Sequence, residues 1–316
     1  MSLSFSIFQE EWWLRAVTGD RYEEATVKQG NQVVGRLPFV MSRHGPFKIS
    51  KMPEFTHLLG PAVQSGGGKP QTQLMRRLSI TRELIEQLPS CAFVKQVFDP
   101  TLADGLAIAD GLAFQDRHFE VSPQYTFQID AGSDPAIMWE AMHFKVRQHI
   151  RRADERYRIA EVDDPNRFIG FYIENLKRMG RKNLIDFSGF PRLFEETQAR
   201  SCGLLLSAVT DRGTPAAMAF LVWGHGVMYY LLSTRAPELD ENGAVSLLIW
   251  TAMKRAHQLN VRFDLDGVYS SGSARFLIGF GGRIGLRLIA VRTQKSYRTL
   301  QAMKRQLYPN PSVGFA

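Results

Sequence analysis

The sequence predicts an α+β fold in which one structural unit occurs twice, once in each half of the chain. Residues 25–40 and 207–222 both read as a strand, a tight turn and a second strand, and extended chain, a polar loop, a helix and a strand follow each hairpin. At 316 residues the chain is also longer than a typical single domain. We therefore predict two domains, each a mixed, mostly antiparallel twisted sheet flanked by helices. The alternative is that this common order of elements recurs by chance.

In the first half, apolar residues at helical spacing predict a helix over residues 5–17. A glycine-rich loop at 64–70 leads into a second predicted helix. The remaining elements come from apolar runs bounded by turn residues: strands at 25–27, 33–40, 92–98, 114–119 and 125–129, and the helix at 71–87.

The second half begins with a strongly basic helix, which we predict over residues 142–158. Its apolar residues form one stripe that we expect to be buried: Val146, Ile150, Ala153 and Tyr157. Six cations and only two carboxylates surround the stripe. The other predicted elements are helices at 166–178, 189–201, 243–259 and 296–307, and strands at 204–209, 215–223, 227–233 and 261–266.

Composition and charge limit the class of protein. Hydrophobic residues make up 44% and charged residues 22%, which is typical of a globular protein. The net charge of +8 favours anionic partners. Apolar runs are too short to span a bilayer, and two distant cysteines fit a reducing compartment, so we expect a cytoplasmic protein. The seven histidines show no ligand spacing, and we predict no metal site.

Two places in the second half could hold chemistry. The helix that begins near Gly243 presents backbone N–H groups that suit a phosphate, although Asp240 or Asn242 could cap it as in any helix. The strand at 261–266 ends in Asp264 and Asp266, which we expect on one face of the sheet. Carboxylates at such strand ends often line a site, but Asp266 could also only cap the following turn.

Three phrases of the sequence resemble the FemAB-like proteins of the GNAT acyltransferase superfamily. Residues 275–282, R-F-L-I-G-F-G-G, resemble the family phrase R-F-K-x-x-F-G-G, which follows a strand like Phe263–Gly267. Residues 145–153 resemble the phrase K-x-R-x-x-I-R-R-A, and residues 52–61 resemble a first-domain phrase that ends in L-G-P. The matches occur in the family's order and cover most of the chain.

The resemblance implies two tandem GNAT-like domains. The first would span residues 1–130 and be joined by the C-terminal segment 293–316, and the second, with the donor site, would span 131–292. The family transfers acyl groups to amines, from acyl-CoA in a broad set of members and from aminoacyl-tRNA to cell-wall precursors in others. We expect an N-acyltransferase with acyl-CoA as co-substrate; the alternatives are an aminoacyl-tRNA-dependent transferase and a non-catalytic binding protein on the same fold.

The sequence departs from the family at one position that bears on the donor. Leu277 stands where the family has a lysine associated with charged groups of substrate or transition state, which argues against the tRNA-dependent reaction. The loop before residue 243 also fits the GNAT consensus [QR]-x-x-G-x-[GA] poorly, because it supplies Arg235 and then only Gly243 and Ala244.

GNAT-type chemistry implies roles for particular residues. Asp266 would take the proton of the amine and Tyr269 would protonate the leaving group, while backbone N–H groups near residues 230–233 would bind the carbonyl oxygen. The expected donor-binding residues are Tyr230, Leu232, Ser233, Arg235, Asn242, Gly243 and Ala244. The expected acceptor-binding residues are Glu54, His57, Ser273 and Arg275.

The basic segment Lys145–Arg158 has two interpretations. It could be a solvated helix face, or it could bind an anionic partner such as tRNA, the phosphates of CoA or a lipid head group. A nucleic-acid site would interleave exposed aromatic rings with the cations, and Tyr157 falls on the stripe that we expect to be buried.

Overall fold

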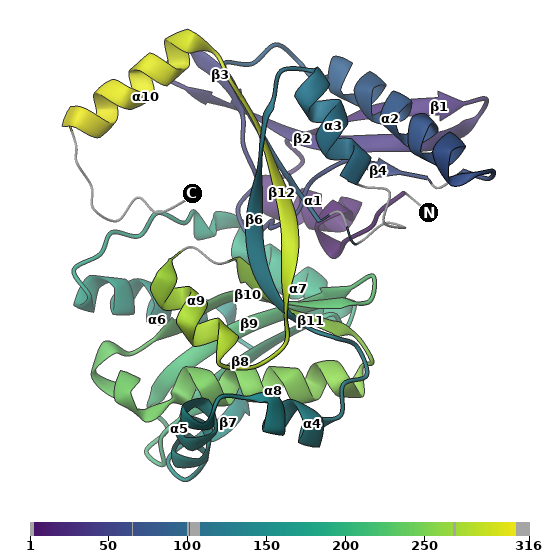
Figure 1. The fold of residues 1–316 in the computed structure, drawn as a ribbon. Coiled ribbons are helices and arrows are strands. Elements are labelled where there is room, and N and C mark those ends of the chain that lie inside the picture. The colour runs from purple at the N-terminus through teal and green to yellow at the C-terminus, as the bar shows by residue number, and fades with distance from the viewer. Residues whose placement is uncertain (1–2, 65, 100, 102–107, 268–269, 308–316) are drawn as a thin grey trace. The chain divides into compact units, whose positions relative to one another are not determined.

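The computed structural model describes residues 3–64, 66–99, 101, 108–267 and 270–307 (Figure 1). The chain forms two compact units. Unit 1 consists of Met1–Gln124 together with Leu286–Ala316, and unit 2 consists of Tyr125–Gly285. Each unit has its own hydrophobic core.

Unit 1 contains a sheet in the order β1-β2-β3-β5-β12, in which only β3 and β5 are parallel among the described pairs. Its strands are β1 (Tyr22–Gln29), β2 (Gln32–His44), β3 (Phe47–Ser50), β4 (Ala62–Val63, beside β2), β5 (Phe93–Phe98) and most of β12 (Arg283–Thr293). Its helices are η1 (Ile7–Gln9), α1 (Glu11–Thr18), α2 (Pro70–Glu86), α3 (Ile108–Asp116) and α10 (Lys295–Leu307).

Unit 2 contains a sheet in the order β6-β11-β10-β9-β8-β7, in which only β10 and β11 are parallel among the described pairs. Its strands are the end of β6 (Glu120–Ile129), β7 (Arg158–Glu161), β8 (Gly203–Val209), β9 (Pro215–Gly224), β10 (Val227–Arg235) and β11 (Arg262–Gly267). Its helices are α4 (Pro135–Ala141), α5 (Phe144–Asp154), α6 (Pro165–Arg178), η2 (Phe187–Gly189), α7 (Phe190–Ala199), η3 (Pro237–Asn242), α8 (Ala244–Gln258) and α9 (Ser271–Ile278).

The predicted duplication is visible in the order of elements. In unit 1 the hairpin β1–β2, the strand β3 and the helix α2 lead to β5, which pairs parallel to β3. In unit 2 the hairpin β8–β9, the strand β10 and the helix α8 lead to β11, which pairs parallel to β10. The predicted α+β fold with two repeated, mostly antiparallel units is therefore confirmed.

The basic helix α5 has the predicted buried stripe. Val146, Ile150, Ala153 and Tyr157 are all less than 9% exposed and belong to the core of unit 2. The cations at Lys145, Arg151, Arg152, Arg156 and Arg158 are exposed. The predicted helix is too long, because α5 spans only Phe144–Asp154, Tyr157 lies beyond it and Arg158 begins the strand β7. Helical periodicity identified the helix because one face had to be apolar to pack.

Two predictions in the first half are wrong. The run 114–119 is not a strand: α3 extends to Asp116, a left-handed His118 reverses the chain, and β6 begins at Glu120. Ala109 and Ala113 are fully buried at helical spacing, so an apolar helix face was mistaken for a strand. The first helix begins only at Glu11, after the short η1 turn. The strands β7 and β12 and the helix α4 were not predicted.

The pair Gly281–Gly282 brings the chain close to β6. Both residues have positive φ, 78° and 90°. A Cβ on Gly282 would lie 2.5 Å from the carbonyl oxygen of Gln128, so a side chain does not fit there. The two glycines of the R-F-L-I-G-F-G-G phrase therefore have a packing role as well as a conformational one.

We expect Gly282→Ala to lower the free energy of unfolding by about 2 kcal/mol, because the left-handed conformation and the steric contact both disfavour a Cβ. Urea denaturation followed by circular dichroism measures this. Gly213→Ala is the matched control, since Gly213 has φ 76° and a Cβ there would meet no other atom within 4 Å. Equal losses in the two variants would contradict close packing at Gly282.

Candidate active site

The parallel strands β10 and β11 separate near the middle of unit 2. Their pairing covers three positions, from Val227–Arg262 to Tyr229–Asp264. β10 continues to Arg235, and its register with β9 shifts between Tyr230 and Leu232 in a bulge. Beyond Tyr229 the edge of β10 that faces β11 has no further described strand partner, which leaves backbone groups for a ligand.

A pocket of about 530 Å³ opens at the end of β10. Three further elements of unit 2 contribute to its wall: α6, the start of α8 and the start of α9. The residues that line it are Tyr172, Leu176, Met179, Arg181, Ser233, Thr234, Arg235, Val245, Gly272, Ser273 and Phe276. The lining thus combines apolar side chains with hydroxyl groups from α6, β10 and α9.

The charge of this pocket suits an anion. Arg181 and Arg235 are its only charged side chains among the described lining residues. The helix α8 starts beside them with Gly243 as its first cap residue, which has no side chain to satisfy the free N–H groups. The start of α9 differs, because the Ser270 hydroxyl accepts from the Ser273 N–H and caps it. The α8 start adds partial positive charge to the two guanidinium groups.

Only glycine fits at residue 243. Its φ is 72°, and a Cβ there would lie 2.6 Å from the carbonyl oxygen of His149 on α5. This close approach joins the α8 start to the basic helix. A second contact joins that helix to α9, because the N–H of His143 donates to the carbonyl oxygen of Gly279 at 2.9 Å. Two of the three family-like phrases therefore meet within unit 2.

A buried amide supports one hydroxyl of the pocket. Asn175 on α6 is fully buried, and its Nδ2 donates to the Thr234 Oγ1 at 3.1 Å. Because that oxygen accepts from Asn175, the hydroxyl proton of Thr234 is available to another acceptor. Sequence analysis missed both residues, since 59 positions separate them and a single buried Asn carries no sequence pattern.

Tyr230 lies at the bulge with its hydroxyl oxygen covered, although part of its ring is exposed. Burial raises the pKa of Tyr230 to about 12, and the neighbouring Ser233 side chain opposes this shift only in part. The hydroxyl therefore stays protonated at neutral pH and can donate a hydrogen bond.

The two aspartates at the end of β11 have different surroundings. Asp264 is buried, and its carboxylate accepts from the Gln128 amide at 3.1 Å and from the Asp266 N–H at 2.8 Å. The Thr126 hydroxyl lies 2.5 Å from Asp264 Oδ1 and 2.6 Å from the Asp266 carbonyl oxygen. These contacts hold Asp266 in a left-handed conformation, φ 73°. The regular alternation of side chains along β11 therefore ends before Asp266. That alternation was the basis for expecting the carboxylates of Asp264 and Asp266 on one face of the sheet.

The structure places part of the predicted site together. Ser233, Arg235 and Ser273 line the pocket. Tyr230 and Leu232 lie on the same stretch of β10, and Gly243 and Ala244 form the start of α8. Asp266 is half-buried at the diverging end of β11 and is not among the described lining residues, and Arg275 is exposed on α9.

Other predicted residues lie elsewhere or outside the description. Tyr269 and the side chain of Asn242 are not among the described parts of the chain. Glu54 and His57 belong to unit 1, where Glu54 pairs with Lys51 at 3.6 Å and His57 packs against Phe8 with ring centroids 5.4 Å apart. Leu277 is 6% exposed within the core of unit 2, so this position supplies an apolar contact in place of the family's cation.

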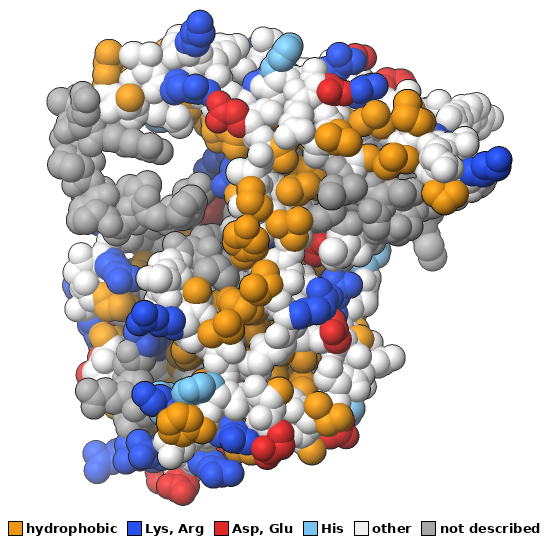
Figure 2. Space-filling view, viewed as in Figure 1, with side chains coloured by type: hydrophobic (Ala, Val, Ile, Leu, Met, Phe, Trp, Pro, Cys, Tyr) orange, Lys and Arg blue, Asp and Glu red, His pale blue; other side chains and the backbone are white. Residues whose placement is uncertain are grey.

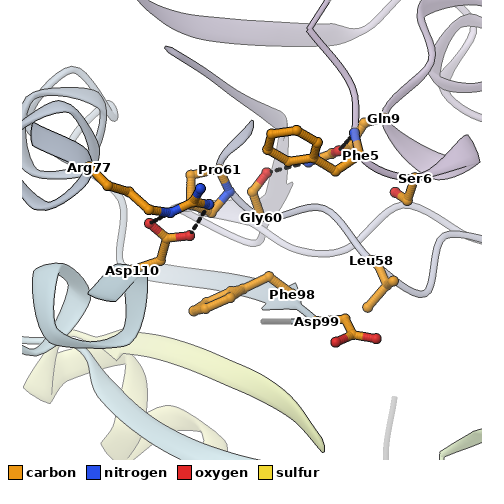
Figure 3. Close-up of a pocket in the computed structure, with 10 residues that line it drawn as sticks. All are labelled: Phe5, Ser6, Gln9, Leu58, Gly60, Pro61, Arg77, Phe98, Asp99 and Asp110. Atoms are coloured by element: carbon orange, nitrogen blue, oxygen red, sulfur yellow. Dashed lines mark hydrogen bonds and ion pairs between the residues drawn. The ribbon is translucent and has the colours of Figure 1, made fainter. Parts of the chain in front are cut away.

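The corresponding region of unit 1 is closed. Beyond the β3–β5 pair, the Leu59 N–H donates to the Val97 carbonyl oxygen at 2.7 Å, so the chain itself covers β5. A cavity lined in part by Leu58, Gly60 and Phe98 has a volume of about 20 Å³, room for about one water molecule (Figure 3). Figure 3 shows the Arg77 guanidinium against the Asp110 carboxylate, with bonds of 3.0 and 2.7 Å.

The described residues were also compared with what a metal site and a membrane-spanning helix require. They contain no group of three or more His, Cys, Asp or Glu side chains that could hold a metal ion. Within the same residues, every helix is too short or too polar to cross a lipid bilayer.

Comparison with known proteins agrees with this geometry. Residues 141–273 match the model of the acetyltransferase (GNAT) domain. The search of curated proteins gives no match. The crystal structure of FemX is similar, with a TM-score of 0.66 and 12% identity over 93% of this chain and 94% of that one. The structure of L-PGS from Bacillus licheniformis is similar at a TM-score of 0.56 and 11% identity, over 100% of this chain and 93% of that one.

A third similar structure is the C-terminal domain of a protein named as a lysylphosphatidylglycerol synthetase from Agrobacterium fabrum. Its TM-score is 0.55 at 13% identity, over 95% of this chain and 92% of that one. At such identities the structures establish the fold, whereas the domain match covers α6, β10 and the start of α8, which line the pocket. Residues 141–273 of this chain are therefore similar to the acetyltransferase (GNAT) domain, and the chain as a whole has a fold similar to that of FemX.

Proposed function

We propose that this protein transfers an acyl group from acyl-CoA to an amine acceptor, with the donor bound in the pocket of unit 2. The observation that carries the proposal is the pocket at the separation of β10 and β11, which lies within the segment that matches the GNAT domain. In unit 1 the chain closes the equivalent position, which supports a single donor site in unit 2.

The charged end of the pocket would bind the phosphates of CoA. Arg181, Arg235 and the N–H groups at the α8 start, with Gly243 and Ala244, are the groups suited to this role. Asn242 is part of the same proposed site. The acyl-pantetheine arm would then extend along the open edge of β10, past Ser233 and Leu232. Backbone N–H groups near Tyr230 would bind the thioester oxygen.

Transfer would proceed by attack of the amine nitrogen on the thioester carbonyl, which forms the N–C bond and breaks the C–S bond. Asp266 is the proposed acceptor of the amine proton, and Tyr269 is the proposed donor of a proton to the leaving thiolate. The left-handed conformation of Asp266, held by Asp264 and Thr126, supports this role because such strained residues cluster at active sites.

Direct attack is favoured over a covalent cysteine intermediate. Unit 2 contains Cys202, and burial raises the pKa of its thiol to about 11. The thiol is therefore a poor nucleophile at neutral pH. Cys91 belongs to unit 1, and burial raises the pKa of its thiol as well. Both cysteines are free, which supports a reducing, cytoplasmic location as part of the proposal.

The acceptor would be an amine recognised in part by Ser273, which lines the pocket, and by the exposed Arg275 on α9. The basic segment Lys145–Arg158, which contains most of α5, is the proposed contact for an anionic partner, tRNA or a lipid head group, because its cations at Lys145, Arg152 and Arg158 are exposed.

Calorimetric titration of the purified protein with CoA and acetyl-CoA at two salt concentrations tests the donor. We expect saturable binding with a Kd of roughly 1 μM to 1 mM, weaker at high salt. A screen of amines with detection of released thiol would then identify the acceptor class. Absence of binding would contradict the acyl-CoA donor, and charged tRNA would be titrated next. Binding without turnover on any amine would favour a non-catalytic protein on this fold, an alternative motivated by the buried Leu277.

A further inference from the structure

The helix α5 combines exposed cations with exposed apolar side chains. Figure 2 shows Lys and Arg side chains gathered over α5, at the lower end of the view, around apolar side chains. Phe144, the first residue of the helix, is 53% exposed, and Ile278 at the end of α9 is 58% exposed. The backbone bond from His143 to Gly279 places these two residues at the same end of α5. An exposed apolar pair among cations is uncommon on a solvated surface.

The positions on the helix follow from its 3.6-residue period. Phe144 lies opposite the buried stripe, with Arg147 and Arg151 on one side of it and Lys145 and Arg152 on the other. The only acidic residues of α5 and its C-cap, Asp154 and Glu155, are at the far end. Arg147 is paired with the Glu140 carboxylate at 2.6 Å. We therefore refer to the surface formed by Phe144, Ile278, Lys145, Arg151 and Arg152 as the α5 face.

Half-buried tryptophans flank the α5 face. The Arg151 guanidinium lies 5.5 Å from the Trp139 ring, and the Lys254 ammonium lies 5.6 Å from the Trp250 ring. The two indole rings contact each other, with centroids 5.3 Å apart. Amphipathic rings next to cations are the arrangement found where a protein meets the head groups of a bilayer.

We propose that the α5 face docks the protein on an anionic lipid surface. Phe144 and Ile278 would enter the boundary between head groups and acyl chains, while the surrounding cations contact lipid phosphates. A nucleic acid would also attract the cations and could stack a base on Phe144, but it offers no apolar partner to Ile278, whereas lipid explains both exposed apolar side chains. This inference is independent of the donor proposal.

Sedimentation with vesicles tests the proposal. We expect the protein to bind vesicles of phosphatidylglycerol and phosphatidylcholine at least tenfold better than vesicles of phosphatidylcholine alone, and less well as salt increases. The pair Lys145→Glu with Arg152→Glu should reduce binding to anionic vesicles roughly tenfold or more, and Phe144→Ala should reduce it severalfold. Circular dichroism checks that each variant is folded.

Matched controls lie elsewhere on unit 2. Arg167→Glu with Arg212→Glu reverses two exposed charges away from the α5 face, and Leu184→Ala removes an exposed apolar side chain; both should leave vesicle binding unchanged. Equal binding to both vesicle types, no binding, equal losses in the controls, or binding to tRNA without binding to vesicles would overturn the proposal. CoA titration without vesicles reports separately on the donor site, so failure of one proposal is distinguishable from failure of the other.

Discussion

Asp266→Asn should lower kcat by roughly 10²-fold or more while leaving the Kd of acyl-CoA close to that of the wild type. Asparagine has nearly the same shape, and like aspartate it tolerates the left-handed backbone that this position requires. The Asp264 carboxylate accepts from the Asp266 N–H and the Thr126 hydroxyl lies against the Asp266 carbonyl oxygen, so the substitution leaves these backbone contacts in place. What it removes is the ability to accept the proton of the attacking amine.

Thiol release, measured with an amine that turns over in the acceptor screen, provides the kinetic test, and titration provides the Kd. Asp211→Asn, in the exposed β8–β9 turn, is the matched control and should have no effect. Thr126→Val should lower both the stability and kcat. It removes the hydroxyl that contacts Asp264 and the Asp266 backbone, but it leaves the Asp266 carboxylate in place. An unchanged kcat in Asp266→Asn would refute the assignment of Asp266 as the general base.

The sequence was informative where one face of an element had to be apolar. The stripe of α5 and the helix α8 have such a pattern, and the hairpins β1–β2 and β8–β9 were recognised from apolar runs bounded by turn residues. The repeated order of elements followed from these. The strand β12 was missed because its exposed and buried residues do not alternate strictly along its length. The run 114–119 was misread because Phe114 and Phe119 are both buried, one at the end of a helix and the other at the start of a strand.

The site could be predicted only as far as local motifs extend. The stretch of β10 around Ser233 and the start of α8 at Gly243 are continuous in sequence, and the structure brings them together in unit 2. The contribution of α6 depends on tertiary packing, which places Tyr172 and Asn175 against β10 from a distant part of the chain. No local pattern marks such residues, because their role comes from the neighbours that folding supplies.

The double variant Arg181→Ala with Arg235→Ala should weaken acyl-CoA binding roughly 10²-fold, with about tenfold from each residue. These guanidinium groups are the only charges among the described residues that line the pocket, and the proposal assigns the CoA phosphates to them. Both side chains are exposed, so each contact should be screened by salt, and the loss should be largest at low ionic strength.

A truncated donor makes this experiment specific. Acyl-pantetheine contains the thioester but lacks the phosphates, so the wild type and the double variant should bind it equally if the guanidinium groups contact phosphate. Arg212→Ala, in an exposed turn, controls for a general loss of positive charge and should leave both affinities unchanged. If the double variant lost affinity for acyl-pantetheine as strongly as for acyl-CoA, the arginines would be shaping the pocket rather than binding phosphate. If neither affinity changed, the phosphates would have to lie elsewhere, and the proposed orientation of the donor along β10 would be wrong.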